Sequence, residues 1–250
     1  MKPTVLRDRA TAPDGTVLSL VEHDGAFAIR VGGVELMSTR QHHSEERLAA
    51  VACATIARRR RPRVLIGGLG FGFTLRETLA RLPHDAVVVV AELVPAVVAW
   101  NRDPAYRLAG PALDDPRVCI EIADVADLLA RPAAPFDAVL LDVDNGAAAL
   151  STAANAWLYT AAGLARTRQA LAPGGCLAVW SAEPDPPFVE RMGRSGFTVT
   201  TQRVPAHAAG GATHHLFVGR ASDGGPVDTA RSPRRRRAAS SRRPPRGRSS

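Results

Sequence analysis

The sequence predicts an α/β fold built on a Rossmann-like, doubly wound sheet. Short apolar runs alternate with segments of helical spacing between residues 63 and 196. Runs such as VVVV (87–90) and AVLL (138–141) show no polar alternation, as expected of parallel strands buried on both faces. Strands that alternate with helices in this way favour a mostly parallel sheet covered by helices on both sides.

Residues 16–37 predict a small antiparallel β-meander ahead of the main sheet. Strand-like runs at 16–23, 26–31 and 34–37 are separated by the pairs Asp24-Gly25 and Gly32-Gly33. Both pairs favour two-residue hairpin turns, because aspartate and glycine tolerate the left-handed backbone that such turns need. We therefore place a meander at residues 1–43.

A helix is predicted at residues 44–59, directly before the first core strand. Its apolar residues have helical spacing, and Ser44 is expected to cap its N-terminus. Glu45 and Glu46 lie in its first turn, where acidic side chains suit the helix dipole. Pro62 is expected to end the helix.

Strands and helices alternate from residue 63 onward. The predicted strands are 63–68, 86–93, 117–123, 136–143 and 174–182, and the predicted helices are 73–82, 95–102, 124–131, 155–171 and 186–196. Two closing strands, 197–204 and 214–221, predict an antiparallel hairpin at the sheet edge. Residues 44–220 are therefore expected to form one Rossmann-like domain.

The remaining residues, 221–250, are expected to form a disordered tail rich in Arg, Ser and Pro. The tail holds nine arginines against Asp223 and Asp228, so it carries +7 of the chain's formal charge of +8. The rest of the chain is close to neutral. A basic, low-complexity tail is expected to contact nucleic acid weakly, or to carry no function.

Several functional classes are disfavoured. Cys53, Cys119 and Cys176 are far apart, and His42-His43 and His214-His215 have no ligand spacing to acids or cysteines, so no metal site is predicted. The N-terminus lacks the apolar run of a signal peptide, and no run approaches the ~20 apolar residues of a membrane helix. We expect a cytoplasmic protein without membrane contact.

The clearest functional signal is the run VLIGGLGFG at 64–72, where a predicted strand passes through glycines into a helix. Gly68, Gly70 and Gly72 can adopt positive φ, and together with Gly67 they let a ligand approach the backbone without a Cβ in the way. The following helix offers free N–H groups and the positive end of its dipole. The pattern predicts a cofactor-binding bend; the alternative is a tight turn without a ligand.

Two acids follow the next strands at the same edge of the sheet. Glu92 lies about 20 residues beyond the glycines, where a carboxylate can accept hydrogen bonds from both ribose hydroxyls. Asp124, with its neighbour Val125, follows the strand 117–123 and can accept a hydrogen bond from an adenine amino group. Capping of the next helix is the alternative role for each acid.

Asp142 ends the strand 136–143 and is the candidate general base. A carboxylate at the top of a central strand faces the crevice of a doubly wound sheet, a suitable place to deprotonate or bind an amine. Asp144 and Asn145 follow it and are candidate substrate-binding residues. The alternative is a solvated turn, because Asp-Asn-Gly is a strong turn former.

Together these motifs resemble the polyamine aminopropyltransferases, the spermidine and spermine synthases. The resemblance covers about residues 16–220, including LRE at 75–77, IADVADLL at 122–129 and FDAVLLD at 136–142. It implies the class I S-adenosylmethionine-dependent methyltransferase type of fold. It also implies a transferase of polyamine biosynthesis that moves an aminopropyl group from decarboxylated S-adenosylmethionine to a small-molecule amine. On this resemblance Glu92 holds the ribose, Asp124 the adenine, and Asp142 the attacking amine.

The sequence departs from the family pattern at three places. Phe71 stands where the family's GGGDG loop has an aspartate that grips the donor's ammonium group. Asp142-Val143-Asp144-Asn145-Gly146 replaces the family's Asp-x-x-Asp-Pro, and Ser44 replaces a tyrosine of the acceptor pocket. Unpaired buried ammonium groups are costly, so the nucleoside half of the site is expected to be kept and the polyamine half to be altered.

Three functions therefore stay open. One is a spermidine-synthase-like transfer of an aminopropyl group, and a second is methyl transfer from S-adenosylmethionine itself to some nucleophilic acceptor. The third is a non-catalytic nucleoside-binding protein. The resemblance also suggests a homodimer or a tetramer.

Overall fold

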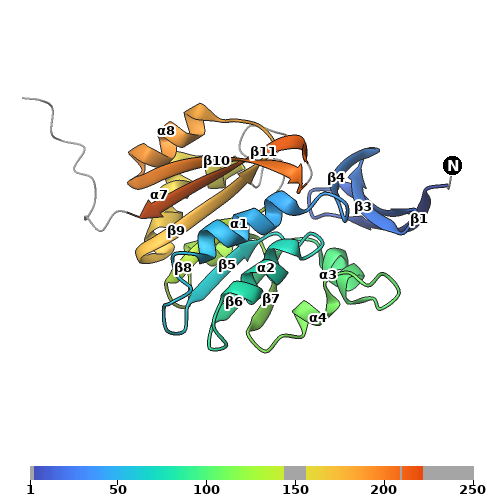
Figure 1. Cartoon of the computed structure of the whole chain (residues 1–250), viewed down its shortest axis with the longest axis horizontal. Coiled ribbons are helices and arrows are strands. Elements are labelled where there is room, and N and C mark those ends of the chain that lie inside the picture. The colour runs from blue at the N-terminus through green and yellow to red at the C-terminus, as the bar shows by residue number, and fades with distance from the viewer. Residues whose placement is uncertain (1–2, 144–155, 209, 222–250) are drawn as a thin grey trace, which may run out of the picture.

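The computed structural model describes residues 3–143, 156–208 and 210–221 of the chain. It contains a four-stranded sheet near the N-terminus and a seven-stranded sheet covered by helices (Figure 1). The N-terminal sheet runs in the order β1-β2-β3-β4, with every neighbouring pair antiparallel. Its strands are β1 (Val5–Thr11), β2 (Val17–His23), β3 (Ala26–Val31) and β4 (Val34–Ser38).

The predicted meander is confirmed and is one strand larger than predicted. Asp24 and Gly25, and likewise Gly32 and Gly33, all have positive φ, as two-residue hairpin turns require. The additional strand is β1, whose sequence VLRDRAT has no apolar alternation. Its side chains are almost all exposed, so backbone pairing with β2, rather than a buried face, holds it in the sheet.

The main sheet has the order β10-β11-β9-β8-β5-β6-β7. Its strands are β5 (Arg63–Gly67), β6 (Val87–Glu92), β7 (Val118–Ile122), β8 (Phe136–Leu141), β9 (Leu171–Ser181), β10 (Phe197–His207) and β11 (Gly210–Ala221). The pairs from β7 through β9 are parallel, whereas β11 is antiparallel to both β9 and β10. The predicted α/β fold is confirmed, and so is the closing hairpin. Of the two hairpin strands only β10 lies at an edge of the sheet, because β11 inserts between β10 and β9.

Helices cover both faces of this sheet (Figure 1). They are α1 (His43–Cys53), α2 (Phe73–Arg81), α3 (Pro95–Arg102), α4 (Gly110–Leu113), α5 (Val125–Ala130), α7 (Ala161–Ala170) and α8 (Pro186–Arg194). A short 3-10 turn, Trp157–Tyr159, precedes α7. The predicted helix 155–171 is interrupted there because Thr160 caps α7, its Oγ1 accepting a hydrogen bond from the Gly163 N–H at 3.1 Å.

Two predictions about α1 are wrong. The helix is capped at His42 without a side-chain hydrogen bond, so Ser44 lies inside it and is not its N-cap. The helix also ends at Cys53 rather than near residue 59. Beyond it, Arg59 forms an ion pair with Asp137, and Arg61 takes a positive φ of 48°. The ion pair and the left-handed backbone at Arg61 accompany a turn toward the start of β5, so the helix ends before Pro62 and not at it.

Alternating residues of the strands pack into two hydrophobic cores, one on each face of the sheet. Ile66 of β5 and Val90 of β6 belong to the core beneath α1, α2 and α3, whereas Leu65 and Val89 belong to the core beneath α5, α7 and α8. The strands therefore bury both faces, as their continuous apolar runs predict. No helix in the described part of the chain is long and apolar enough to cross a membrane.

The N-terminal sheet contacts the main unit through side chains. Trp100 Nε1 of α3 donates a 2.6 Å hydrogen bond to Asp8 Oδ2 of β1. The domain boundaries at 43 and 220 stay predictions. The predicted tail lies outside the described residues, apart from Ala221 at the end of β11.

Candidate functional site at the carboxyl edge of the sheet

The glycine-rich bend joins β5 to α2 and adopts the backbone that its sequence predicts. Gly68, Gly70 and Gly72 have φ values of 87°, 53° and 74°. The Gly72 N–H donates to the Leu69 carbonyl at 2.8 Å, and Gly72 then caps α2 in a left-handed conformation. A residue with a Cβ is strained at each of these positive φ values.

Other elements pack closely on Gly67 and Gly68, and at Gly68 the approach of a backbone atom leaves no room for a Cβ. A Cβ on Gly68 would lie 2.5 Å from the backbone oxygen of Asp142, and one on Gly67 would lie 3.1 Å from Val125 Cγ2. The Asp142 N–H in turn donates to the Gly67 carbonyl at 3.0 Å. The bend, the start of α5 and the end of β8 therefore meet at one point, where the sheet order reverses direction.

Glu92, the last residue of β6, points its carboxylate into the bend. Its Oε2 accepts a hydrogen bond from the Leu69 N–H at 2.9 Å, and its Oε1 accepts one from the Val94 N–H at 2.8 Å. The residue is only 7% exposed. Burial raises the pKa of Glu92, and the backbone N–H donors around it oppose that rise.

Asn101 of α3 holds the other side of the bend, a role that the sequence analysis missed. Its Nδ2 donates to the Gly70 carbonyl and to the Val97 carbonyl, both at 2.8 Å, while its Oδ1 accepts from the Ala109 N–H at 3.1 Å. Asn101 is 2% exposed. The sequence feature that could have indicated this role is the amide side chain near the end of the short helix PAVVAWNR.

The side chain nearest to Gly70 comes from the N-terminal sheet. A Cβ on Gly70 would lie 3.1 Å from Met37 Sδ, at the end of β4. Met37 is a flexible, unbranched side chain, so it can change rotamer at small cost when a ligand approaches. The small sheet therefore forms one wall of the candidate site.

Asp124 has the capping role that the sequence left open. Its Oδ1 accepts a hydrogen bond from the Ala126 N–H at 2.8 Å, which caps α5. Val125, the first residue of α5, is 4% exposed and packs toward Gly67. The Ala123 N–H donates to the Glu92 carbonyl at 3.1 Å, so the loop that carries Asp124 runs beside the end of β6.

Asp142 follows β8 and receives a hydrogen bond from α2. Thr74 Oγ1 donates to Asp142 Oδ2 at 2.6 Å. Burial raises the pKa of Asp142 from 3.8 to about 6, and the threonine hydroxyl opposes this rise. A carboxyl group with such a pKa is ionised at neutral pH yet basic enough to accept a proton. Asp144 and Asn145, the other candidate substrate-binding residues, lie outside the described residues.

A second carboxylate approaches Asp142 from α1. Glu45 Oε2 is buried and has no hydrogen-bond partner among the described residues. Burial raises the pKa of Glu45 well above its usual value, and the nearby charges of Asp142 and Glu46 raise it further, whereas Arg76 lowers it. Sequence reasoning assigned Glu45 only to the helix dipole.

The chain is similar in sequence to known transferases. The chain is 33% identical over 156 residues to polyamine aminopropyltransferases of Mycobacterium tuberculosis and Mycobacterium bovis. That match covers 61% of this chain. The chain is related to the polyamine aminopropyltransferases.

The match covers only 28% of the length of each of these aminopropyltransferases. The solved spermidine synthase of Thermotoga maritima has the same fold, with a TM-score of 0.69 at 19% identity, covering 88% of this chain and 73% of that one. A spermidine synthase in complex with the transition-state analogue AdoDATO gives a TM-score of 0.68 at 19% identity, over 88% of this chain and 72% of that one. No family model matches the chain.

The relationship to aminopropyltransferases confirms the resemblance found in the sequence. Phe71, the residue at the place of the family's loop aspartate, is 3% exposed and belongs to the core beneath α1 and α2. Its side chain is therefore part of the packing.

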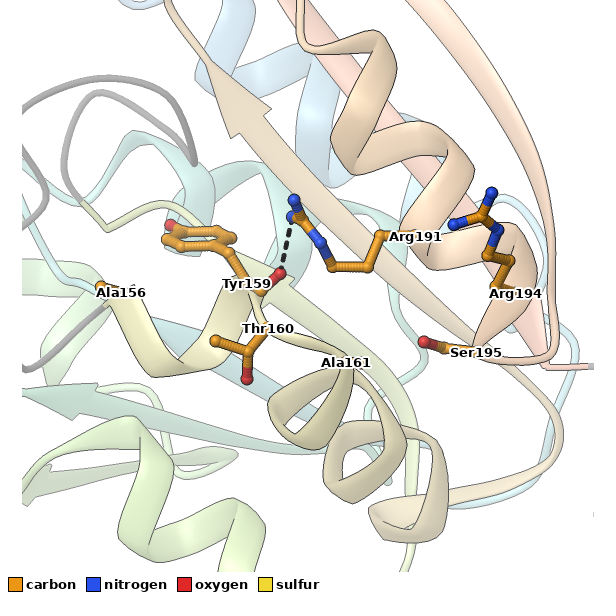
Figure 2. Close-up of a pocket in the computed structure, with 7 residues that line it drawn as sticks. All are labelled: Ala156, Tyr159, Thr160, Ala161, Arg191, Arg194 and Ser195. Atoms are coloured by element: carbon orange, nitrogen blue, oxygen red, sulfur yellow. Dashed lines mark hydrogen bonds between the residues drawn. The ribbon is translucent and has the colours of Figure 1, made fainter.

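A separate cavity of about 480 Å³ lies between α7 and α8 (Figure 2). It is lined by Ala156, Tyr159, Thr160, Ala161, Arg191, Arg194 and Ser195. Arg191 Nη1 donates to the Tyr159 carbonyl at 2.9 Å across it. None of the predicted site residues that the structure describes lines this cavity.

Proposed function

We propose that the chain is a spermidine-synthase-like transferase that binds an S-adenosylmethionine-type donor at the bend after β5. The arrangement of Glu92, the glycine-rich bend and Asp142 at one edge of the sheet carries this proposal. At its glycines the bend offers backbone without side chains, and the acids stand on either side of it. The relationship to aminopropyltransferases supports the reaction class.

The nucleoside half of the donor would use the acids after β6 and β7. Each oxygen of the Glu92 carboxylate accepts one backbone hydrogen bond, and a carboxylate oxygen can accept a second. Glu92 would thus accept from the ribose hydroxyls while still holding the bend. Asp124 would accept from the adenine amino group, with Val125 and Gly67 beside the ring.

Asp142 would act on the acceptor. In the transfer, the lone pair of the amine nitrogen forms a bond to the carbon attached to the donor's sulfonium. The carbon–sulfur bond breaks, and its electrons stay on sulfur, which becomes a neutral thioether. The proton lost by the amine passes to Asp142, whose pKa of about 6 suits a general base near neutral pH.

The experiment is a turnover assay with decarboxylated S-adenosylmethionine and putrescine, which measures methylthioadenosine. We expect product from the wild-type chain and at least about 100-fold less from Asp142→Asn, because a general base contributes about that much or more. Absence of product from the wild type, beside an active aminopropyltransferase as positive control, would reject aminopropyl transfer.

Methyl transfer from S-adenosylmethionine itself is the second candidate, and Phe71 favours it. With an apolar, buried side chain at this position, the bend has no carboxylate there to repel the donor's own carboxylate. The same assay with S-adenosylmethionine and a panel of amines tests it through release of S-adenosylhomocysteine. The predicted homodimer and the weak contact of the tail with nucleic acid stay predictions.

A further inference from the structure

One oxygen of the Glu45 carboxyl group is a buried acceptor without a donor among the described residues. Glu45 Oε2 is shielded from solvent and lacks a hydrogen-bond partner in the part of the chain that the structure describes. Buried polar atoms in native proteins are nearly always satisfied, and a buried carboxylate without a partner is costly. A ligand that brings hydrogen-bond donors to Oε2 would remove that cost.

Two contacts of the Thr74 hydroxyl connect the backbone of Glu45 with the side chain of Asp142. Thr74 Oγ1 lies 2.6 Å from Asp142 Oδ2 and 3.4 Å from the Glu45 carbonyl oxygen. One hydroxyl of α2 therefore touches both the start of α1 and the end of β8. The charge of Asp142 also raises the pKa of Glu45, so the two carboxylates are electrostatic neighbours.

The other charged groups nearby are already engaged. Glu46 Oε1 lies 2.8 Å from His42 Nδ1. The Arg76 guanidinium stands 4.4 Å from the centre of the Phe73 ring, and its Nη1 donates to the Phe71 carbonyl at 3.4 Å. Burial raises the pKa values of Glu45 and Asp142, so a cation bound between them would stabilise their ionised forms.

Ser44 fixes the start of α1 and thus the position of Glu45. Trp180 Nε1 of β9 donates to Ser44 Oγ at 2.9 Å, and the same hydroxyl forms a hydrogen bond with His214 Nδ1 of β11, 2.8 Å away. Burial lowers the pKa of His214, which favours the neutral ring. Ser44 is 2% exposed and acts as an anchor for α1, not as a group open to a substrate.

We propose that Glu45 and Asp142 form a subsite for the primary ammonium group of an amine-bearing substrate, with Glu45 binding the cation and Asp142 free to take a proton. This inference rests on the proposed transferase function. An ammonium group carries three N–H donors and a positive charge, which match the unpartnered acceptor on Glu45 and the neighbouring Asp142 carboxyl group. Among the described residues, no group of three or more His, Cys, Asp or Glu side chains is placed to hold a metal ion.

On this proposal the chain has an ammonium-binding carboxylate although Phe71 replaces the family's loop aspartate. The carboxylate would come from the first turn of α1 rather than from the bend. The ammonium group can belong to the donor's aminopropyl chain or to the acceptor amine, and the experiment separates these two sources.

The experiment is calorimetric titration of the full chain, the wild type beside Glu45→Gln and Glu46→Gln. Glu46→Gln makes the same chemical change one residue along the same helix turn, so it controls for a general change of charge. The probes are decarboxylated S-adenosylmethionine, methylthioadenosine, which lacks the ammonium group, and putrescine added to protein saturated with methylthioadenosine.

We expect Glu45→Gln to weaken an ammonium-bearing probe by about 10- to 100-fold, as for loss of a charge-assisted hydrogen bond. Methylthioadenosine should bind the wild type and both variants equally, within about twofold. Weakening of the decarboxylated donor assigns the subsite to the donor, and weakening of putrescine assigns it to the acceptor. Either result supports the inference.

Other outcomes separate the inference from the proposed function. If the wild type binds methylthioadenosine but Glu45→Gln keeps full affinity for both ammonium-bearing probes, the subsite is rejected and the transferase proposal stands. An equal loss in Glu46→Gln also rejects a specific role for Glu45. If the wild type binds none of the probes, the proposed function fails and the subsite with it.

A folding measurement guards against a merely structural effect. Because Glu45→Gln removes a buried carboxyl group that lacks a partner among the described residues, we expect its thermal midpoint to equal or exceed that of the wild type. A lower midpoint combined with weaker binding of methylthioadenosine would mean that Glu45 supports the fold, and would overturn the subsite.

Discussion

Glu92 Oε2 accepts a hydrogen bond from the Leu69 N–H at 2.9 Å, so the acid that ends β6 holds the bend that follows β5. The carboxylate also binds the Val94 N–H and is almost wholly buried. The Glu92 carboxylate therefore has a structural role in the bend as well as its proposed role in ligand binding. A change at Glu92 must affect both the backbone of the bend and any nucleoside bound there.

We expect Glu92→Gln to destabilise the protein and to weaken nucleoside binding. A glutamine presents one NH₂ group in place of an oxygen, so the Leu69 or the Val94 N–H would face a donor instead of an acceptor. The loss should be about 1–3 kcal/mol of unfolding free energy. Urea denaturation measures it, with calorimetry of methylthioadenosine binding alongside.

Glu121→Gln serves as the control for Glu92→Gln. Glu121 lies on the neighbouring strand β7 and is exposed, so its replacement should leave both quantities nearly unchanged. Equal stability and equal binding in Glu92→Gln would contradict the role assigned to this carboxylate.

Asp142 predicts a pH dependence of stability with a defined sign. Its pKa is raised in the folded chain from 3.8 to about 6, so the folded state holds the proton over a range where the unfolded state has lost it. Stability should therefore fall as the pH rises from 4 to 7, by roughly 3 kcal/mol from this group. Urea denaturation across this range should show a flatter profile for Asp142→Asn than for the wild type.

Titration of Glu45 and Glu92 also lowers the stability of the fold as the pH rises. The pKa values of Glu45 and Glu92 are also raised by burial, so the wild-type decline includes their contributions. The difference between the wild type and Asp142→Asn isolates Asp142 and its effect on Glu45. Parallel profiles for the two proteins would show that Asp142 titrates normally.

The parts of the site that the sequence predicted are those set by backbone chemistry. Glycines that follow a buried strand and precede a helix indicate positive φ, and Gly68, Gly70 and Gly72 have it. Acids at the ends of parallel strands must meet at one edge of the sheet, so the neighbourhood of Glu92 and Asp142 followed from the alternation of strands and helices.

The parts that the sequence did not predict depend on side chains brought together by tertiary packing. Glu45 in the first turn of a helix suits the dipole on local grounds, and its approach to Asp142 depends on where α1 docks. That docking is held by Ser44, whose partner His214 lies 170 residues away along the chain. β1 was missed for a related reason, because its pairing with β2 leaves no apolar pattern.

Asn101 is expected to be essential for the shape of the bend. Asn101→Asp keeps an oxygen to accept from the Ala109 N–H but loses the Nδ2 donor to the Gly70 and Val97 carbonyls. We expect it to cost about 1–3 kcal/mol of stability and to speed amide hydrogen exchange at the Gly72 N–H. Exchange at the Ala109 N–H should change less. Unchanged exchange at Gly72 would show that Asn101 does not restrain the bend.

Gly68 and Gly33 form a matched pair that separates backbone strain from close approach. Both have positive φ, 87° and 84°. A Cβ on Gly33 meets nothing within 4 Å, whereas one on Gly68 would lie 2.5 Å from the Asp142 carbonyl oxygen. We expect Gly33→Ala to cost about 1–2 kcal/mol, the penalty of a left-handed alanine, and Gly68→Ala to cost more than about 3 kcal/mol. Chemical denaturation of both variants measures the difference.

Because the clash would push Asp142 away from the bend, Gly68→Ala should also lose activity in the transferase assay, while Gly33→Ala keeps it. Similar stability losses in the two variants would show that β8 does not press on the bend, and the proposed arrangement of Asp142 beside the donor would lose its support.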